Sequence, residues 1–463
     1  MDSVKNNKDI DYAALNSDFD WGLYKEAEEF VKSRTAQFLS KNHFANELSK
    51  RMSDETSTTF FNWIDHIAIP ESSVRTRDLE RMGFIEKKSK EESAVFVHPS
   101  SYLFPVLLRK RADTEVALKP EELDSFLQIL GKGVKVEGSP FSHFRKASIN
   151  NENGFILSAI ERRGYDGFSQ SESEDIDRYI SMLSSFLNRK RFFESDEEGL
   201  SETKKAIAKA VKNLDSARVS DAFFRAERLY WERRNKAGQI QKSRQERLGL
   251  GWGNQDHHTY RSSRANFLSM IKIFESMGYK CRERYYAGEE AKWGAQILEH
   301  PTCNIVVFTD VDLYPEETKI DFAHEGLEDR TTLGTVGLWV GLHGESILQA
   351  GMHHLEARFD FDKLSKDLPG FGVEVMPPFS YFEFLKQAFT VGERWGVEKK
   401  RLDTLLSKGS ITKDQYETFL KNGAIGSHME NLERRQGFKG FNKSSVTKII
   451  KATDPRMQKS SGA

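Results

Sequence analysis

The stretch that decides the fold is Asp65-His66-Ile67-Ala68-Ile69, and a second copy of its first two residues stands at Asp256-His257. In both places an amphipathic stretch follows, and then several apolar segments. The matching features are Met82-Gly83-Phe84 and Met277-Gly278-Tyr279 at the end of the amphipathic stretch, and His98-Pro99 and His300-Pro301 between two apolar segments. Each copy predicts a strand, a helix and then strands. Two such βαβββ-like units could pair around one cavity and aim two histidines at one point, as a mononuclear metal site requires.

The composition narrows the class of protein. The 463 residues carry 69 basic and 70 acidic side chains, so we expect no nucleic-acid partner. No apolar run approaches the roughly 18 residues of a membrane span, and residues 1–20 lack the apolar core of a signal peptide. Only two cysteines occur, Cys281 and Cys303, and neither belongs to a Cys-x-x-Cys spacing, which favours a reducing, cytoplasmic setting and argues against a cysteine-ligated zinc site.

The order of strand-like and helix-like segments along the chain predicts an α+β protein. In it, two paired βαβββ-type units form a half-barrel cavity and helical segments are added to them. The charged block between the copies favours helices, with stripes such as Ile176, Ile180 and Leu183 at helical spacing. We therefore expect five parts: an N-terminal helical segment (1–59), a first unit (60–165), a helical insertion (166–250), a second unit (251–375), and a C-terminal helical segment with a lid over the cavity (376–463).

These motifs resemble the vicinal oxygen chelate superfamily, which contains glyoxalases and extradiol dioxygenases. Within it, the closest likeness is to the 2-oxoadipate dioxygenase/decarboxylase (hydroxyglutarate synthase) family. The resemblance rests on Asp65-His66-Ile67-Ala68, on His257-x-Thr259-x-Arg261 and on the wide separation of the two copies. It covers residues 60–110 and 250–360.

The resemblance implies a ferrous ion held by one histidine from the first strand of each unit and by a carboxylate from a late strand of the second unit. Carried over, the histidines are His66 and His257. His258 is adjacent to His257, but neighbouring residues of a strand point to opposite faces, so only one of them can enter the cavity. The match with Asp65-His66 selects His257.

The third metal ligand is predicted in the segment 351–359. There His354, Glu356 and Arg358 share one face of a strand, and the opposite face is mostly apolar. This pattern suits a carboxylate aimed into a polar cavity, so Glu356 is the predicted ligand, and His354 and Arg358 are predicted catalytic residues beside it. Three other carboxylates stay open as alternatives: Glu299, Glu345 and Glu430. The last of these could equally belong to a charged helix.

Arg261 is predicted to bind substrate and to take part in catalysis. It lies four residues after His257 on the same strand face, and a guanidinium can bind a carboxylate through two hydrogen bonds. The resembled family has an arginine at the equivalent place. The first unit departs from the family, because Pro70 stands where another arginine is expected. Arg109 is the predicted second substrate-binding residue, and Arg145 or Arg358 could also compensate.

The resemblance and the ligand set together predict an enzyme, a mononuclear oxygenase that uses Fe(II) and dioxygen to decarboxylate and hydroxylate a 2-oxo acid or a related small carboxylate. Two alternatives remain open. One is an isomerase or lyase on the same scaffold with another divalent metal, and the other is a non-catalytic protein that binds a small molecule.

Overall fold

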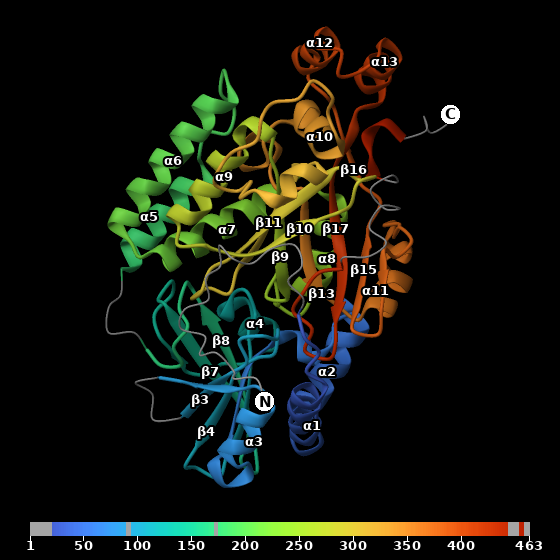
Figure 1. Cartoon of the computed structure of the whole chain (residues 1–463). Coiled ribbons are helices and arrows are strands. Elements are labelled where there is room, and N and C mark those ends of the chain that lie inside the picture. Colours follow the sequence, from blue (N-terminus) through green and yellow to red (C-terminus); the bar gives the residue numbers. More distant parts are fainter. Residues whose placement is uncertain (1–20, 89–93, 171–174, 443–452, 458–463) are drawn as a thin grey trace.

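The computed structural model describes residues 21–88, 94–170, 175–442 and 453–457. Two curved β-sheets lie one below the other in Figure 1. The lower one, here called the first sheet, has eight strands in the order β2-β3-β4-β1-β5-β8-β7-β6. Its strands are β1 (Ile64–Pro70), β2 (Ile85–Lys87), β3 (Ala94–Val97), β4 (Val106–Arg109), β5 (Thr114–Leu118), β6 (Val136–Glu137), β7 (Phe144–Glu152) and β8 (Phe155–Arg162).

The second sheet has nine strands, in the order β10-β11-β12-β9-β13-β17-β15-β14, with β16 also paired to β17. Its strands are β9 (Gln255–Arg261), β10 (Lys280–Tyr286), β11 (Trp293–Glu299), β12 (Val306–Asp312), β13 (His354–Arg358), β14 (Ser380–Tyr381), β15 (Leu385–Phe389), β16 (Glu393–Trp395) and β17 (Ala424–Arg434).

Each sheet consists of two βαβββ modules. A helix follows the first strand of each module: α3 (Thr76–Arg81), α4 (Leu123–Ile129), α9 (Arg264–Ser276) and α11 (Phe361–Asp367). The first strands of paired modules are antiparallel neighbours, β1 with β5 and β9 with β13. The α+β class with paired modules is thus confirmed. The pairing partners differ from the expectation, because each sequence copy pairs with an unrecognised module in its own sheet and the two copies do not pair with each other.

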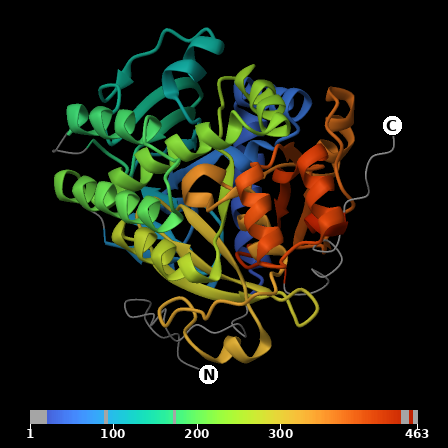
Figure 2. The same ribbon diagram turned by 90° about the horizontal axis from the view of Figure 1, so that it is seen from above.

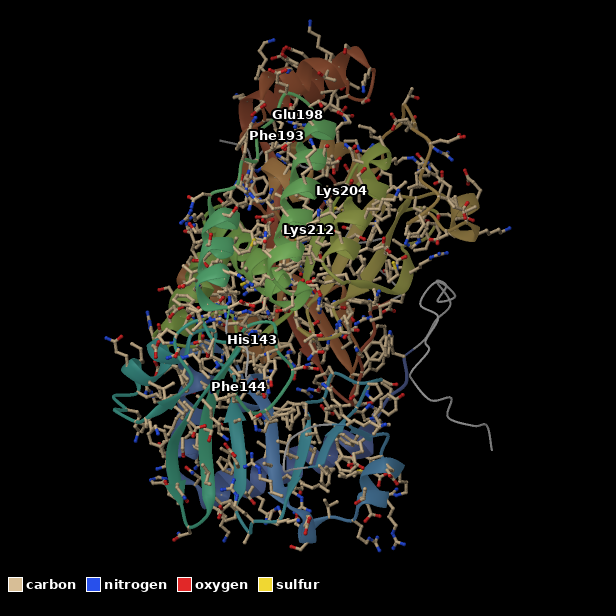
Figure 3. All side chains as sticks on the ribbon, turned by 90° about the vertical axis from the view of Figure 1, so that its left-hand side faces the viewer. His143, Phe144, Phe193, Glu198, Lys204 and Lys212 are labelled. Atoms are coloured by element: carbon tan, nitrogen blue, oxygen red, sulfur yellow. The ribbon has the colours of Figure 1, made fainter. Side chains whose placement is uncertain are left out.

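The helical insertion covers one side of the second sheet. It contains α5 (Ile176–Leu187), α6 (Asp196–Asn213), α7 (Ser216–Glu232) and α8 (Lys236–Glu246). Figure 3 shows this side, with Lys204 and Lys212 along α6 and, below them, Phe144 at the start of β7 and His143 just before it. In the view from above, the green insertion and the orange-red helices α12 (Lys399–Ser407) and α13 (Lys413–Asn422) lie on different sides (Figure 2).

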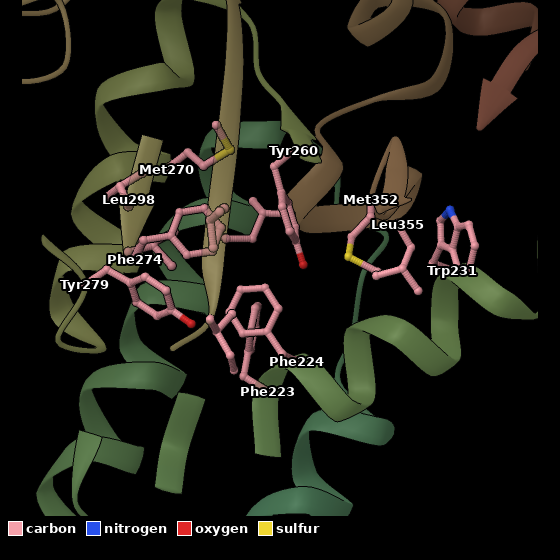
Figure 4. Packing of buried hydrophobic residues seen from close by; sticks show 14 of the residues in the cluster. Phe223, Phe224, Trp231, Tyr260, Met270, Phe274, Tyr279, Leu298, Met352 and Leu355 are labelled. Carbon is pink, nitrogen blue, oxygen red and sulfur yellow. The ribbon is translucent and has the colours of Figure 1, made fainter. Parts of the chain in front are cut away.

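The main core lies between the insertion and the outer face of the second sheet. Phe224 of α7 packs within 6.2 Å of Phe274 on α9, and Tyr260 of β9 lies 5.2 Å from Phe274, ring centre to ring centre (Figure 4). All three side chains are fully buried. Because residues alternate along β9, burial of Tyr260 in this core turns its neighbours Thr259 and Arg261 to the opposite face of the sheet.

A second core joins the N-terminal helices α1 (Lys25–Lys41) and α2 (His43–Thr56) to the first sheet. Phe38 of α1 lies 6.3 Å from Phe155 on β8. Asn42 begins α2 because its side chain accepts a hydrogen bond from the backbone N–H of Ala45. Residues 21–59 are helical for the most part, and residues 1–20 lie outside the described part.

The repeated Met-Gly-aromatic motif ends a helix in both copies. Gly83 and Gly278 have φ values of 95° and 92°, which only glycine adopts without strain. A Cβ atom on either glycine would also meet a histidine, His98 at 2.5 Å in one copy and His300 at 2.9 Å in the other. These two histidines precede turns and lie against the glycines at the helix ends.

The C-terminal region differs from its predicted structure. Residues 376–434 supply strands β14 to β17 and complete the fourth module, and only α12 and α13 form longer helices there. The charged residues of β17 gave it the appearance of a helix in the sequence, but pairing with β13 and β15 makes it a strand. Segment 443–452, part of the predicted lid, lies outside the described residues. None of the described helices is long and apolar enough to cross a membrane.

Candidate metal centre

Three buried side chains of the second sheet come together at one point. His257, Glu356 and Glu430 each offer a ligand atom, and these atoms all lie within 4.8 Å of one another. The residues stand on adjacent strands in direct register, His257 of β9 opposite Glu356 of β13, and Glu356 opposite Glu430 of β17. The distance from Nε2 of His257 to Oε1 of Glu356 is 3.5 Å. The register of three strands therefore creates the cluster.

Strand alternation decides which histidine of β9 joins the cluster. His257 lies on the same face as Thr259 and Arg261, and all three line a cavity. His258 points to the other face, where its ring lies 4.8 Å from that of Phe224 in the main core.

Each member of the cluster has a neighbour that fixes its orientation. Nδ1 of His257 is 2.9 Å from Oδ1 of Asp256, and Arg434 donates hydrogen bonds to both oxygens of Asp256. Thr259 donates a hydrogen bond of 2.5 Å to Oε1 of Glu356. Gln387 donates one of 2.8 Å to Oε1 of Glu430. Such outer partners orient ligands around protein-bound metals.

Burial sets the charge of His257, and Asp256, held by Arg434, sets its tautomer. Burial acts to raise the pKa of Asp256, but Arg434 and His257 outweigh it and hold that pKa below its usual range. Burial lowers the pKa of His257 and outweighs the opposite effect of Asp256. The imidazole is therefore neutral, donates through Nδ1 to the carboxylate, and keeps a lone pair on Nε2.

The pKa values of the two glutamates are both raised. Burial raises the pKa of Glu356 well above its usual range, and the charge of Glu430 raises it further. Burial also raises the pKa of Glu430. Two adjacent buried carboxylates are costly unless a cation lies between them.

A divalent cation fits this donor set. Oε2 of Glu356 is buried without a hydrogen-bond partner among the described residues, and Nε2 of His257, 3.5 Å from Oε1 of the same carboxylate, keeps its lone pair. One imidazole and two carboxylates suit several divalent metals, including Fe(II) and Mn(II).

The cluster lies in the wall of a cavity whose lining combines polar side chains with six aromatic ones. Arg261 is the cationic side chain in its lining, and Nε of Arg261 lies 3.3 Å from Oδ2 of Asp310. The aromatic lining residues are Tyr285, Trp293, Phe308, Phe379, Phe389 and Phe441. Phe441, Asn442 and Thr453 also border the cavity, so the described chain on both sides of segment 443–452 reaches it.

His66, the other predicted ligand, is not brought to this cluster. It lies on β1 of the first sheet, where its Nδ1 is 2.7 Å from Asp65 and its ring lies 5.0 Å from that of Phe168. The pairing of modules within each sheet explains the difference, because it separates the first strands of the two sequence copies into two sheets.

The predicted arginines lie at different places in the structure. Arg261 lines the cavity, as the sequence suggests. Arg109 lies on β4 of the first sheet and is paired with Glu115, away from the described cavity lining. Arg145 is also in the first sheet, bound to Asp124. Arg358 is partly buried, with its Nε 3.9 Å from Oδ2 of Asp256, and is absent from the described lining. Each of these three guanidiniums compensates a carboxylate of its own surroundings.

His354 lines the cavity near Glu356 and stacks on Phe389, with ring centres 4.5 Å apart. Its Nε2 is 2.8 Å from Nδ1 of His353, and its Nδ1 has no hydrogen-bond partner among the described residues. The strand face predicted for His354 and Glu356 is therefore the face that the structure turns to the cavity.

Of the alternative carboxylates, Glu430 joins His257 and Glu356. Glu299 is paired with Lys439, and Glu345 accepts hydrogen bonds from Ser263. The signal for Glu430 was present in the alternation of β17, where His428 and Glu430 share a face, but its charged neighbours also fitted a helix.

Comparison with known proteins identifies similar folds only. No family model matches the chain, and no curated protein matches it. Solved structures that align with it include a putative hydrolase from Shewanella frigidimarina (18% identity, 48% of this chain, 98% of that chain, TM-score 0.33). A methylmalonyl-CoA epimerase from Mycobacterium tuberculosis aligns with 12% identity over 40% of this chain and 89% of its own, TM-score 0.23.

A mutant 4-hydroxymandelate synthase from Streptomyces coelicolor aligns over 86% of this chain and 99% of its own, with 10% identity and a TM-score of 0.29. Because these TM-scores are all 0.33 or lower, the function has to be inferred from the side chains of the cavity.

Proposed function

We propose that the protein is a metal-dependent enzyme whose centre is His257, Glu356 and Glu430, and that it is an Fe(II)-dependent dioxygenase of a 2-oxo acid or related small carboxylate. The observation that carries the proposal is the meeting of three buried, individually oriented ligand atoms on neighbouring strands. With three protein donors on one face, the metal would offer its remaining positions to substrate and dioxygen and would supply the oxidative chemistry.

The residues around the metal would bind and orient the substrate. Arg261 would bind an anionic group through its guanidinium, and His354 would present the partnerless Nδ1 to the substrate. The aromatic walls would exclude water from the reacting groups. Asp256 would keep the proton of His257 on Nδ1, so that Nε2 stays available as a ligand.

A second candidate is an isomerase or lyase that uses another divalent metal as a Lewis acid. The two carboxylates favour it, because a carboxylate-rich donor set suits Mn(II) as well as Fe(II). Here Arg261 and His354 would have the same positioning roles.

The test is to load the protein anaerobically with Fe(II), Mn(II) or Zn(II), measure metal content, and then follow oxygen uptake with a panel of 2-oxo acids. The dioxygenase predicts about one metal per chain and substrate-dependent oxygen uptake with Fe(II). Conversion without oxygen uptake would select the second candidate. A protein that binds none of these metals would refute both.

A further inference from the structure

A second polar pair lies in the same cavity, on the strands β9 and β12. Arg261 and Asp310 stand opposite each other in the parallel register of these strands, and both line the cavity. Arg261 is four residues from His257, which places their Cα atoms about 13 Å apart along an extended strand. The cavity therefore has a metal-ligand cluster at one point and an arginine–aspartate pair at another, and its lining also includes aromatic side chains.

The pair is incomplete as an ion pair. Its contact is the single one from Nε of Arg261 to Oδ2 of Asp310, at 3.3 Å. Elsewhere in the molecule, Arg434 donates to both oxygens of Asp256 from two of its nitrogens, and Arg145 does the same to Asp124. Among the described residues, the Nη atoms of Arg261 have no hydrogen-bond partner. A pair built only for stability would be expected to have the two-point geometry.

The free oxygen of Asp310 is the stronger indication. Asp310 is 2% exposed, and its Oδ1 has no hydrogen-bond partner among the described residues. A buried acceptor without a partner is unfavourable and calls for an explanation. Burial also raises the pKa of Asp310 to about 7, although Arg261 acts in the opposite direction. A cationic donor beside Oδ1 would give this oxygen a hydrogen-bond partner and would also stabilise the ionised carboxylate.

We propose that Arg261 and Asp310 bind an α-amino-acid group of the substrate, with the carboxylate on Arg261 and the ammonium on Asp310. This deepens the proposed function and rests on it, because the rest of the substrate would extend from this pair to the metal. An α-amino acid carries its anion and its cation on one carbon, which matches an arginine and an aspartate that are neighbours across two strands. The aromatic side chains along the cavity suit an apolar or aromatic middle.

The position has no counterpart in the first sheet. The parallel register of β1 with β4 places Pro70 opposite Arg109, where the register of β9 with β12 places Arg261 opposite Asp310. The pair thus belongs to the sheet that holds the metal-ligand cluster.

The test uses two probes that differ only in the ammonium: 4-carboxy-L-phenylalanine and 3-(4-carboxyphenyl)propanoate. Binding to the Mn(II)-loaded full-length protein is measured by titration calorimetry. We expect the wild type to bind the amino acid at least tenfold more tightly. Asp310→Asn, which keeps the shape of the side chain, should lose this preference and bind the second probe as well as the wild type does. Arg261→Gln should weaken both probes at least tenfold.

Equal binding of the two probes by the wild type would overturn the proposal, as would binding of neither probe or a preference that survives in Asp310→Asn. The wild-type comparison needs no variant, so a variant that fails to fold does not remove the test. Metal content is measured on the same samples. A protein that binds no metal contradicts the proposed function. In that case the affinities of the metal-free chain for L-phenylalanine and for 3-phenylpropanoate are compared, and the role of Asp310 again requires at least tenfold tighter binding of the amino acid.

Discussion

The two sheets have the same arrangement of modules but differ at the centre. In the first sheet His66 pairs in register with Ala117, and Ala117 with Ser158. In the second sheet the corresponding run is His257, Glu356 and Glu430. Both sheets have the histidine, and only the second has carboxylates at the two positions that pair with it in register.

The support of the histidine is also common to both sheets. Asp65 contacts His66 and accepts two hydrogen bonds from Arg162 of β8. Asp256 contacts His257 and is held in the same way by Arg434 of β17. An Asp–His–Arg arrangement is therefore a structural element of this fold, and the neighbouring strands decide whether it becomes part of a metal site.

The largest expected effect comes from removing a carboxylate of the second sheet. Glu356→Gln or Glu430→Gln should weaken metal binding more than about 100-fold, beyond the usual loss for an outer partner, because a ligand charge disappears while the shape is kept. Metal titration of the purified variants measures this. His66→Ala is the matched control in the first sheet and should keep wild-type affinity; a comparable loss there would break the comparison.

The stability of the metal-free protein should depend on pH through the same carboxylates. Burial raises the pKa of Glu430 to about 8, well above that of an exposed glutamate, so the protonated carboxyl stabilises the folded state at low pH and this stability is lost as the pH rises toward 8. The loss should approach roughly 1.4 kcal/mol per pH unit for one proton.

Urea unfolding between pH 5 and 8 measures this dependence, and the difference between wild type and Glu430→Gln isolates it from other titrating groups. Metal loading should remove the difference between the wild type and Glu430→Gln in how steeply the free energy of unfolding changes with pH. Identical slopes for the metal-free wild type and the variant would contradict the raised pKa.

The next effect concerns the partner of the histidine. Asp256→Asn should weaken metal binding about 10- to 100-fold, because it removes the acceptor charge that holds the proton on Nδ1 of His257. Asp65→Asn makes the same change in the first sheet and should leave metal affinity unaltered. Calorimetric metal titration compares them, and equal losses in both variants would show that the sheets do not differ as proposed.

The smallest effect is expected at Thr259, which hydrogen-bonds Glu356. Thr259→Val keeps the shape and removes the hydroxyl, so metal affinity should fall only several-fold, up to about tenfold, at the low end of the range for outer partners. Thr259→Ser, which retains the hydroxyl, should restore most of the affinity. If both variants behaved alike, the hydrogen bond would have no part in orienting Glu356.

The sequence by itself determined the elements that depend on local pattern. Alternation along 351–359 placed His354 and Glu356 on one face, alternation along β9 with the repeat selected His257 over His258, and the spacing from His257 placed Arg261 with them. The α+β class followed from the repeated strand–helix–strand order. Each of these needs only the period of a strand or a helix, which is a property of neighbouring residues.

Only the tertiary structure decided which strands lie side by side. The repeat suggested that His66 and His257 would meet, but each copy pairs with a module that the sequence does not mark, and their sheets are separate. Glu430 enters the cluster through the parallel pairing of β17 with β13, across more than 70 residues of chain. Such pairing depends on burial of whole sheet faces and on the register between distant strands, and no local pattern contains that information.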